Sequence, residues 1–101
     1  MNDNSKKPTR RIVQLIALLA KHADNGLRPK QIAEELEVSA SMVTRDMADL
    51  EAEGFAERVP GREEAWRLGN KAVRTLRTHL MGLERATAHL REIEERAKRE
   101  F

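Results

Sequence analysis

Apolar residues recur at helical spacing in three successive stretches of the first half of the chain. The first stretch predicts a helix that begins at Pro8 or Thr9 and ends at Asn25-Gly26, with an apolar face made of Ile12, Leu15, Ile16, Leu19 and Ala23. The second predicts a helix from Pro29, a residue suited to the first helical position, to about Leu36. The third lies between Ser39, a favourable N-cap, and Gly54, a common C-terminal stop.

The second and third helices share the apolar positions that two crossed helices need for a common core. These positions are Ile32, Ala33, Leu36, Val38, Val43, Met47 and Leu50. The opposite side of the third helix, about residues 40–53, then faces outward and carries Ser41, Met42, Thr44, Arg45 and Asp49. A helix presented in this way fits the major groove of duplex DNA. We therefore expect function to depend on that outward face.

After Gly54 the pattern changes from helices to two short strands. The segments FAERV and AWRL alternate imperfectly on either side of a Pro60-Gly61 turn. Their inward residues are predicted to be Phe55, Val59, Trp66 and Leu68. The expected fold class is mainly α, with a small two-stranded ribbon and a further long helix after it.

Residues 70–101 favour one long helix, for which Asn70 is available as a cap. Its apolar stripe consists of Val73, Leu76, Leu80, Leu83, Thr87 and Leu90, and it continues on a shifted line through Ile93, Ala97 and Phe101. Gly82 costs about 1 kcal/mol relative to alanine in a helix interior, which marks it as the place for any kink or break.

Such a stripe needs a cover. It could fold back onto the first helix, but it runs for about 40 Å at 1.5 Å per residue, longer than so small a domain can cover. A second chain is the better candidate, with dimerisation through Val73, Leu76, Leu80, Leu83, Leu90 and Ile93. The expected organisation is a flexible basic arm at 1–8, a folded domain at 9–69 and a dimerisation helix at 70–101.

The composition narrows the possible classes of protein. The chain has no cysteine, which excludes disulfides, thiolate nucleophiles and cysteine metal sites. Its longest apolar run, Ile12 to Ala20, is interrupted by Gln14 and is far shorter than the ~20 residues of a bilayer span. The N-terminus lacks the features of a signal peptide. We therefore expect a cytoplasmic protein, in a prokaryotic cytosol or nucleoid, without membrane contact.

Catalytic and metal sites find no support in the pattern. The three histidines lack the mutual spacing of metal ligands, and pairs such as Glu34-Glu35 and Glu94-Glu95 are typical of solvated helix faces. Trp66 is better explained as a core anchor than as a residue that stacks on bases. No enzyme activity, metal or cofactor is predicted.

Charge is unevenly distributed although the net value is only +2. Residues 1–30 carry seven Lys or Arg against two Asp, residues 31–66 carry three Arg against ten acids, and residues 67–101 carry nine bases against five acids. A phosphate-binding surface would have to draw on the N-terminal arm, Arg45, the ribbon and the start of the last helix. The acidic middle segment would suit a basic protein partner instead.

From helix to helix-turn-helix to ribbon, the chain resembles the winged helix-turn-helix DNA-binding domain of bacterial regulators. It is similar to the N-terminal domain of the IclR family and more loosely to MarR-type regulators. The likeness covers residues 10–69 and rests on RIVQLIALLAKH, LRPKQIAEELEVSASMVTRDMADLEAEGF and the terminal WRLG. It implies that the third helix contacts DNA through Ser41, Met42, Thr44 and Arg45, with Arg62 at the tip of the wing.

The chain departs from that family at three positions inside the motif. Arg28 stands where Ser or Thr usually precedes the second helix, Glu37 where the turn usually has Gly, and Asp46 where Leu is favoured. A left-handed Glu37 would cost roughly 1 to 2 kcal/mol. The effector-binding domain of that family is replaced by the long helix, so we expect no small-molecule effector.

Each candidate residue has a plainer explanation as well. Arg45 could contact guanine or phosphate, or pair with Asp49 one helical turn away. Ser41 and Thr44 could donate to DNA or serve capping and solubility. Arg62 could enter a minor groove, although Glu63 and Glu64 beside it would repel phosphates. The remaining bases could follow the phosphate backbone or belong to an ordinary charged surface; they are Lys6, Lys7, Arg10, Arg11 and Lys30.

Two functions remain after these exclusions. The first is a homodimeric, sequence-specific transcriptional regulator that binds double-stranded DNA through the third helix. The alternative is a winged-helix adaptor for protein–protein contacts in a nucleoprotein assembly. The position of the charges separates them, since a basic surface over the third helix favours DNA and an acidic one favours the adaptor.

Overall fold

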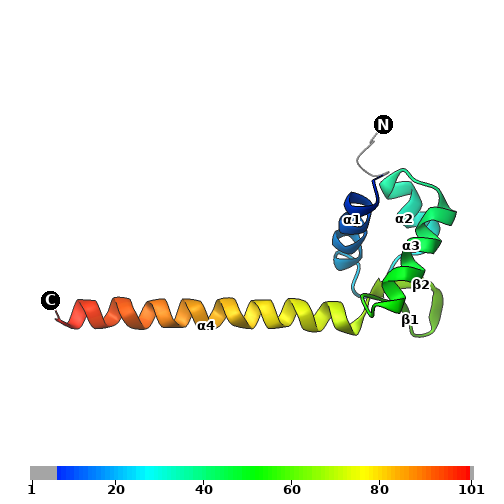
Figure 1. Cartoon of the computed structure of the whole chain (residues 1–101). Coiled ribbons are helices and arrows are strands. Elements are labelled where there is room, and N and C mark those ends of the chain that lie inside the picture. The colour runs from blue at the N-terminus through cyan, green and yellow to red at the C-terminus, as the bar shows by residue number, and fades with distance from the viewer. Residues whose placement is uncertain (1–6, 101) are drawn as a thin grey trace.

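The computed structural model describes residues 7–100, and within them the chain folds into helices and one small sheet. The elements follow in the order α1 (Pro8–Ala20), α2 (Pro29–Leu36), α3 (Ala40–Ala52), β1 (Ala56–Val59), β2 (Arg62–Leu68) and α4 (Asn70–Glu100) (Figure 1). The expected fold class is confirmed: a mainly helical chain with a two-stranded wing and a long C-terminal helix. Residues 1–6 of the expected arm, Lys6 among them, and Phe101 lie outside the described residues.

One aliphatic core joins α1, α2, α3 and the sheet. Its fully buried side chains are Leu15, Leu19, Ile32, Val43 and Met47. Around them pack Leu27, Leu36, Leu50, Ala56 and Trp66, which are also buried, while Val38, Phe55 and Leu68 are partly buried against the cluster. Every apolar position predicted for the α2–α3 core thus contributes to it. Burial of this one core holds α3 in place.

The helix ends follow local chemistry. α2 begins at Pro29 as predicted, and the backbone N–H of Arg28 donates to Gln31 Oε1 at 2.9 Å. This is the return bond of a capping box, so a backbone donor before α2 is satisfied without the usual Ser or Thr. α1 stops at Ala20, earlier than predicted, because residues 21–25 form turns that put Ala23 outside the helix.

The turn between α2 and α3 depends on Glu37. This residue has φ 58 and ψ 45, the left-handed conformation that ends α2 and turns the chain toward α3. It is the one described non-glycine residue with positive φ. A side chain in this conformation costs roughly 1 to 2 kcal/mol. The departure from glycine seen in the sequence is therefore a real strain in the turn.

The wing, defined here as β1, β2 and the turn between them, is an antiparallel hairpin. Gly61 has φ 81 directly after Pro60, the positive φ that a type II turn requires at that position. β2 starts at Arg62, so it is longer than the predicted AWRL segment. Val59 and Trp66 are buried as predicted, whereas Phe55 and Leu68 are only partly buried.

A single bridge joins the wing to the segment before α2. Leu27 N–H donates to the carbonyl of Trp66 at 2.8 Å, and Trp66 N–H donates to the carbonyl of Leu27 at 2.7 Å. Gly26 makes this approach possible, because a Cβ there would lie 2.5 Å from the Trp66 oxygen and 2.6 Å from Val59 Cγ2. These two hydrogen bonds therefore tie the wing to the α1–α2 connection.

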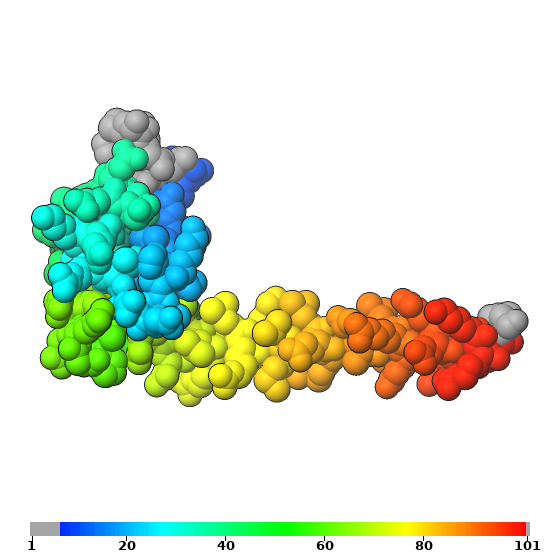
Figure 2. Space-filling model, turned by 180° about the vertical axis from the view of Figure 1, so that it is seen from behind, coloured from blue at the N-terminus to red at the C-terminus, as the bar shows by residue number. Residues whose placement is uncertain are grey.

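α4 leaves the folded domain as one arm of an L (Figures 1 and 2). The chain measures 63 × 34 × 20 Å along its principal axes. α4 is helical from Asn70 onward, so Asn70 is its first residue, and the helix passes through Gly82 without a break. Among the described residues of α4, only Ala72 is buried. The helix does not fold back onto α1.

Candidate nucleic-acid interface

The exposed side of α3 carries Ser41, Thr44 and Arg45. These residues are spaced three and four apart, so their side chains share one side of the helix. All three are exposed, while Val43, Asp46, Met47 and Leu50 of the same helix are buried. Hydrophobic burial of one side of α3 thus fixes which polar side chains face solvent.

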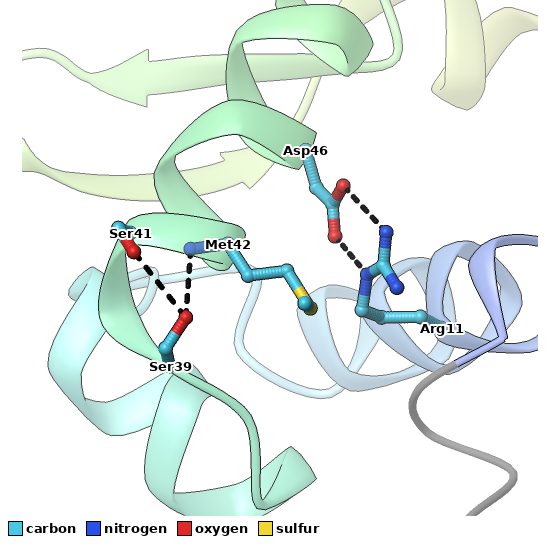
Figure 3. A network of polar contacts seen from close by, with 5 residues as sticks. All are labelled: Arg11, Ser39, Ser41, Met42 and Asp46. Carbon is cyan, nitrogen blue, oxygen red and sulfur yellow. Dashed lines mark hydrogen bonds and ion pairs between the residues drawn. The ribbon is translucent and has the colours of Figure 1, made fainter.

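Polar contacts hold the start of α3 in shape (Figure 3). Ser39 Oγ accepts the backbone N–H of Met42 at 3.1 Å, which is the predicted N-cap, and it lies 3.3 Å from Ser41 Oγ. Thr44 Oγ1 donates to the Ala40 carbonyl at 3.0 Å and keeps its oxygen available as an acceptor. These contacts therefore cap and brace the first turn of α3.

Met42 differs from the outward position expected for it. It is half-buried, and its side chain extends from α3 toward Arg11 (Figure 3). Only part of its surface is available to a ligand.

Arg11 and Asp46 form a buried ion pair between α1 and α3. The guanidinium donates from Nε to Asp46 Oδ2 and from a terminal nitrogen to Oδ1 at 3.1 Å (Figure 3). Arg11 is 8% exposed and Asp46 7%. Hydrogen bonding to Asp46 raises the pKa of Arg11 against the opposing effect of burial, and the charge of Asp46 adds to the rise. Arg11 therefore carries its positive charge at neutral pH.

This pair corrects one expectation. Arg11 was predicted to follow the phosphate backbone, but its charge is turned inward and used on Asp46. An apolar core can hold a carboxylate only with such a partner, because an unpaired buried charge is strongly unfavourable. The pair also explains how a carboxylate can occupy a buried position on α3.

The charges on α3 are divided along its length. Asp46 is the only acid in residues 40–48, and it is buried. The exposed acids Asp49, Glu51 and Glu53 all lie in the second half of the helix or directly after it. The exposed N-terminal half therefore presents two hydroxyl groups and the Arg45 cation, with no carboxylate among them.

Arg45 is not paired with Asp49. The ion pairs formed within residues 7–100 are Arg11–Asp46, Arg28–Glu64 and Arg67–Glu57. The plainer explanation of Arg45 as half of a helix-surface ion pair thus finds no support in the structure.

The wing contributes two exposed arginines. Arg62 begins β2 next to the turn, as expected. The guanidinium of Arg58 lies 4.3 Å from the centre of the Trp66 ring, and it donates to the Glu63 carbonyl at 2.8 Å. Glu64, which was predicted to repel phosphates, forms an exposed ion pair with Arg28. Its Oε2 lies 3.5 Å from Arg28 Nη2. The sequence pattern indicated Arg62 as a wing contact but did not indicate Arg58.

The remaining predicted bases lie on separate elements. Arg10 is exposed on α1, Lys30 lies on α2, and Lys7 precedes α1.

Within residues 7–100 no cluster of three or more His, Asp or Glu side chains could hold a metal ion. None of the helices in that range combines the length and the apolar character needed to cross a bilayer.

Comparison with known proteins agrees with this architecture. Residues 11–62, just over half of the chain, match the HTH domain family. No curated protein matches the sequence. Among solved structures, the chain is similar to a point mutant of ZitR from Lactococcus lactis, with a TM-score of 0.51 and 24% sequence identity. The superposition covers 81% of this chain and 57% of that one.

The structural likeness to ZitR concerns the fold, whereas the family match identifies the domain. The matched segment extends from the first turn of α1 to the first residue of β2, and so includes the two crossed helices, the Glu37 turn and β1. From its sequence and architecture together, the chain belongs to the HTH domain family, the helix-turn-helix class of DNA-binding domains.

Proposed function

We propose that the protein is a transcriptional regulator that binds duplex DNA as a homodimer, with α3 in the major groove. The observation that carries the proposal is the exposed N-terminal half of α3, where Ser41, Thr44 and Arg45 face solvent and the only acid is buried. In helix-turn-helix proteins, the N-terminal residues of the motif's second helix contact base edges, and α3 is that helix in this chain.

Arg45 is the main candidate for base recognition. A guanidinium can donate two hydrogen bonds to guanine O6 and N7, or clamp a phosphate. The hydroxyls of Ser41 and Thr44 suit phosphate or base contacts, and the N-terminal end of the helix adds a partial positive charge. Recognition at this end of α3 thus combines one cation with two adaptable polar groups.

The rest of the domain would position α3 on the duplex. Arg58 and Arg62 on the wing, Arg10 on α1 and Lys30 on α2 are cations available to phosphates. Residues 1–8 are proposed as a basic arm. The residue pattern supports an IclR-type, more loosely MarR-like, winged helix in a non-enzymatic cytoplasmic protein. No small-molecule effector is part of the proposal.

The exposed stripe of α4 supports the proposed dimer. Val73, Leu76, Leu80, Leu83, Leu90 and Ile93 are 41–59% exposed, so the predicted stripe has no cover within the described residues. A second copy would provide one and would bring a second α3 to a two-fold DNA site. Two linked contacts raise affinity for such a site well above that of one.

The test is DNA binding by an Arg45→Ala variant. Duplexes selected from a random pool by the unaltered protein serve as probes, and Arg85→Ala on α4 is the matched control. We expect Arg45→Ala to weaken binding by about 5-fold to 150-fold, since one good arginine–base contact contributes about 1 to 3 kcal/mol of discrimination. Arg85→Ala should bind normally.

Salt dependence provides the second readout. Phosphate contacts release counterions, so the affinity should fall steeply as salt rises. Absence of salt-dependent binding to any duplex in the pool would contradict the proposal.

An adaptor for a basic protein is the second candidate function. The observation in its favour is a group of exposed acidic residues on or directly after α2 and the second half of α3. They are Glu34, Glu35, Glu37, Asp49, Glu51 and Glu53. Charge-reversal of Asp49 and Glu51 to lysine separates the two functions. It should strengthen duplex binding if α3 contacts DNA, and it should abolish binding of a basic partner if α3 is an adaptor surface.

A further inference from the structure

An apolar groove lies in the inner angle of the L, between the end of α1 and the start of α4. We call it the corner groove; its cavity of about 390 Å³ is lined chiefly by Leu19, Ala20, Ala23, Leu68, Val73 and Leu76. The C-terminal end of α1 lies directly above the first turns of α4, here called the root of α4, in both views (Figures 1 and 2). The groove is thus open toward the side along which α4 extends.

The corner groove and the stripe of α4 form one continuous apolar surface. Val73 and Leu76 line the groove and also begin the stripe. From there the stripe continues along α4 through Leu80, Leu83 and Leu90, each more than half exposed. A helix lying on this stripe and directed toward the root would end in the groove.

We propose that the corner groove holds the far end of α4 from a second copy, so that the two α4 helices pair antiparallel. The proposal rests on the homodimer of the proposed function and specifies its geometry. Each folded domain would then cover the last turns of its partner's helix, from about Leu90 onward.

The direction of pairing follows first from shape. At the root, the stripe faces the same side as α1, because Val73 and Leu76 share the groove with Leu19 and Ala20. Two copies pressed together along this face in parallel would bring both domains into the same inner angle, where they would overlap. In the antiparallel arrangement, only a bare helix about 10 Å wide has to enter that angle.

Charge favours the same direction. The first half of α4 carries Lys71, Arg74 and Arg77 with no acid before Glu84. Residues 91–100 carry four acids and four bases. Parallel pairing would set two groups of three cations side by side, whereas antiparallel pairing sets each group against a segment that contains acids.

The polar residues on the stripe agree with this arrangement. The three-four spacing that starts at Val73 reaches Thr87 and then Glu94. Thr87 Oγ1 already donates to the Leu83 carbonyl at 2.9 Å, so its methyl group can be covered without leaving an unpaired hydroxyl. In a parallel pair, Glu94 would face the same carboxylate of the second copy. In an antiparallel pair, it would lie toward the basic first turns of the partner's α4.

Spin labels on the whole 101-residue chain measure the direction in which the two α4 helices pair. Because the natural sequence has no cysteine, Lys71→Cys and Arg99→Cys each give a single labelling site, near the two ends of α4. Paired helices are about 8–10 Å apart, so like labels should lie within roughly 25 Å of each other in a parallel dimer. In an antiparallel dimer they should be more than about 30 Å apart at 1.5 Å per residue.

A mixture of the two labelled proteins tests the antiparallel arrangement directly. In the mixed dimers we expect a short distance between the label at position 71 and the label at position 99. In dimers of either protein alone we expect long distances. Short distances between like labels would overturn the antiparallel proposal while leaving the homodimer intact. A monomer by sedimentation at all concentrations tested would instead remove the homodimer itself; because DNA is absent, neither result depends on duplex binding.

The groove is tested by Ala20→Glu, with Ala17→Glu as the matched control. Both residues are exposed on α1, but only Ala20 lines the corner groove. A carboxylate in a covered apolar groove is unfavourable, so Ala20→Glu should raise the dimer dissociation constant about tenfold or more. Ala17→Glu should leave it unchanged. Equal dissociation constants for both variants would overturn the groove as the docking site.

Discussion

Removing one member of the Arg11–Asp46 pair should destabilise the fold far more than removing both. Both side chains are buried, and they share two hydrogen bonds between α1 and α3. With Asp46→Leu, the Arg11 cation is left inside the domain without its carboxylate. Loss of one partner of a buried pair costs about 3 to 5 kcal/mol, a large share of the stability of a small domain.

The double variant should recover most of that loss. Arg11→Met with Asp46→Leu replaces the pair by apolar groups of similar size, and such replacements are often neutral or stabilising. The coupling between the two substitutions should therefore be at least about 2 kcal/mol.

Urea unfolding followed by circular dichroism measures this cycle on the unaltered protein, both single variants and the double variant. All four are compared at one protein concentration, because assembly shifts apparent stability. In a parallel thermal unfolding experiment, the melting temperature should fall by roughly 4 to 8 °C for each kcal/mol of stability lost. Single substitutions that cost under about 1 kcal/mol, or effects that simply add, would refute the assignment of a buried pair.

Three further substitutions test the local geometry. Glu37→Gly should stabilise the protein by about 1 kcal/mol in the same urea assay, because glycine relieves the left-handed strain; a loss of stability would contradict that conformation. Ser39→Ala should cost about 1 kcal/mol by removing the cap of α3, with Ser41→Ala as the milder control. Gly26→Ala should cost more than about 2 kcal/mol, since its Cβ would meet the Trp66 carbonyl and φ is +69, and a melting temperature equal to that of the unaltered protein would exclude this close approach.

The helical part of the fold could be predicted because its determinants are close together in the sequence. Pro29 marks the start of α2, and Ser39 and Gly54 bracket α3 within a few residues of the observed ends. The same holds for the wing turn at Pro60-Gly61. Where the signal was weaker the boundary moved: α1 ended before Ala23, and β2 began earlier than the apolar alternation suggested.

The role of Arg11 could not be predicted from the pattern, because its partner lies 35 residues away. A basic residue near the N-terminus looks like a phosphate contact until its ion pair with Asp46 on α3 is seen. Asp46, a polar residue on the inner side of a helix, was the available signal that some cation must face it. Arg58 was missed for a similar reason, since only the hairpin register places it against Trp66.

Trp66 gives the protein a built-in optical reporter. The sequence has one tryptophan and no tyrosine, so near-ultraviolet emission comes almost entirely from a single indole ring. That ring is buried where the Leu27 bridge meets the wing, and the Arg58 guanidinium lies over it. If a nucleic acid drew Arg58 away, the surroundings of the indole would change, and a titration of unlabelled protein would register the event as a change in fluorescence.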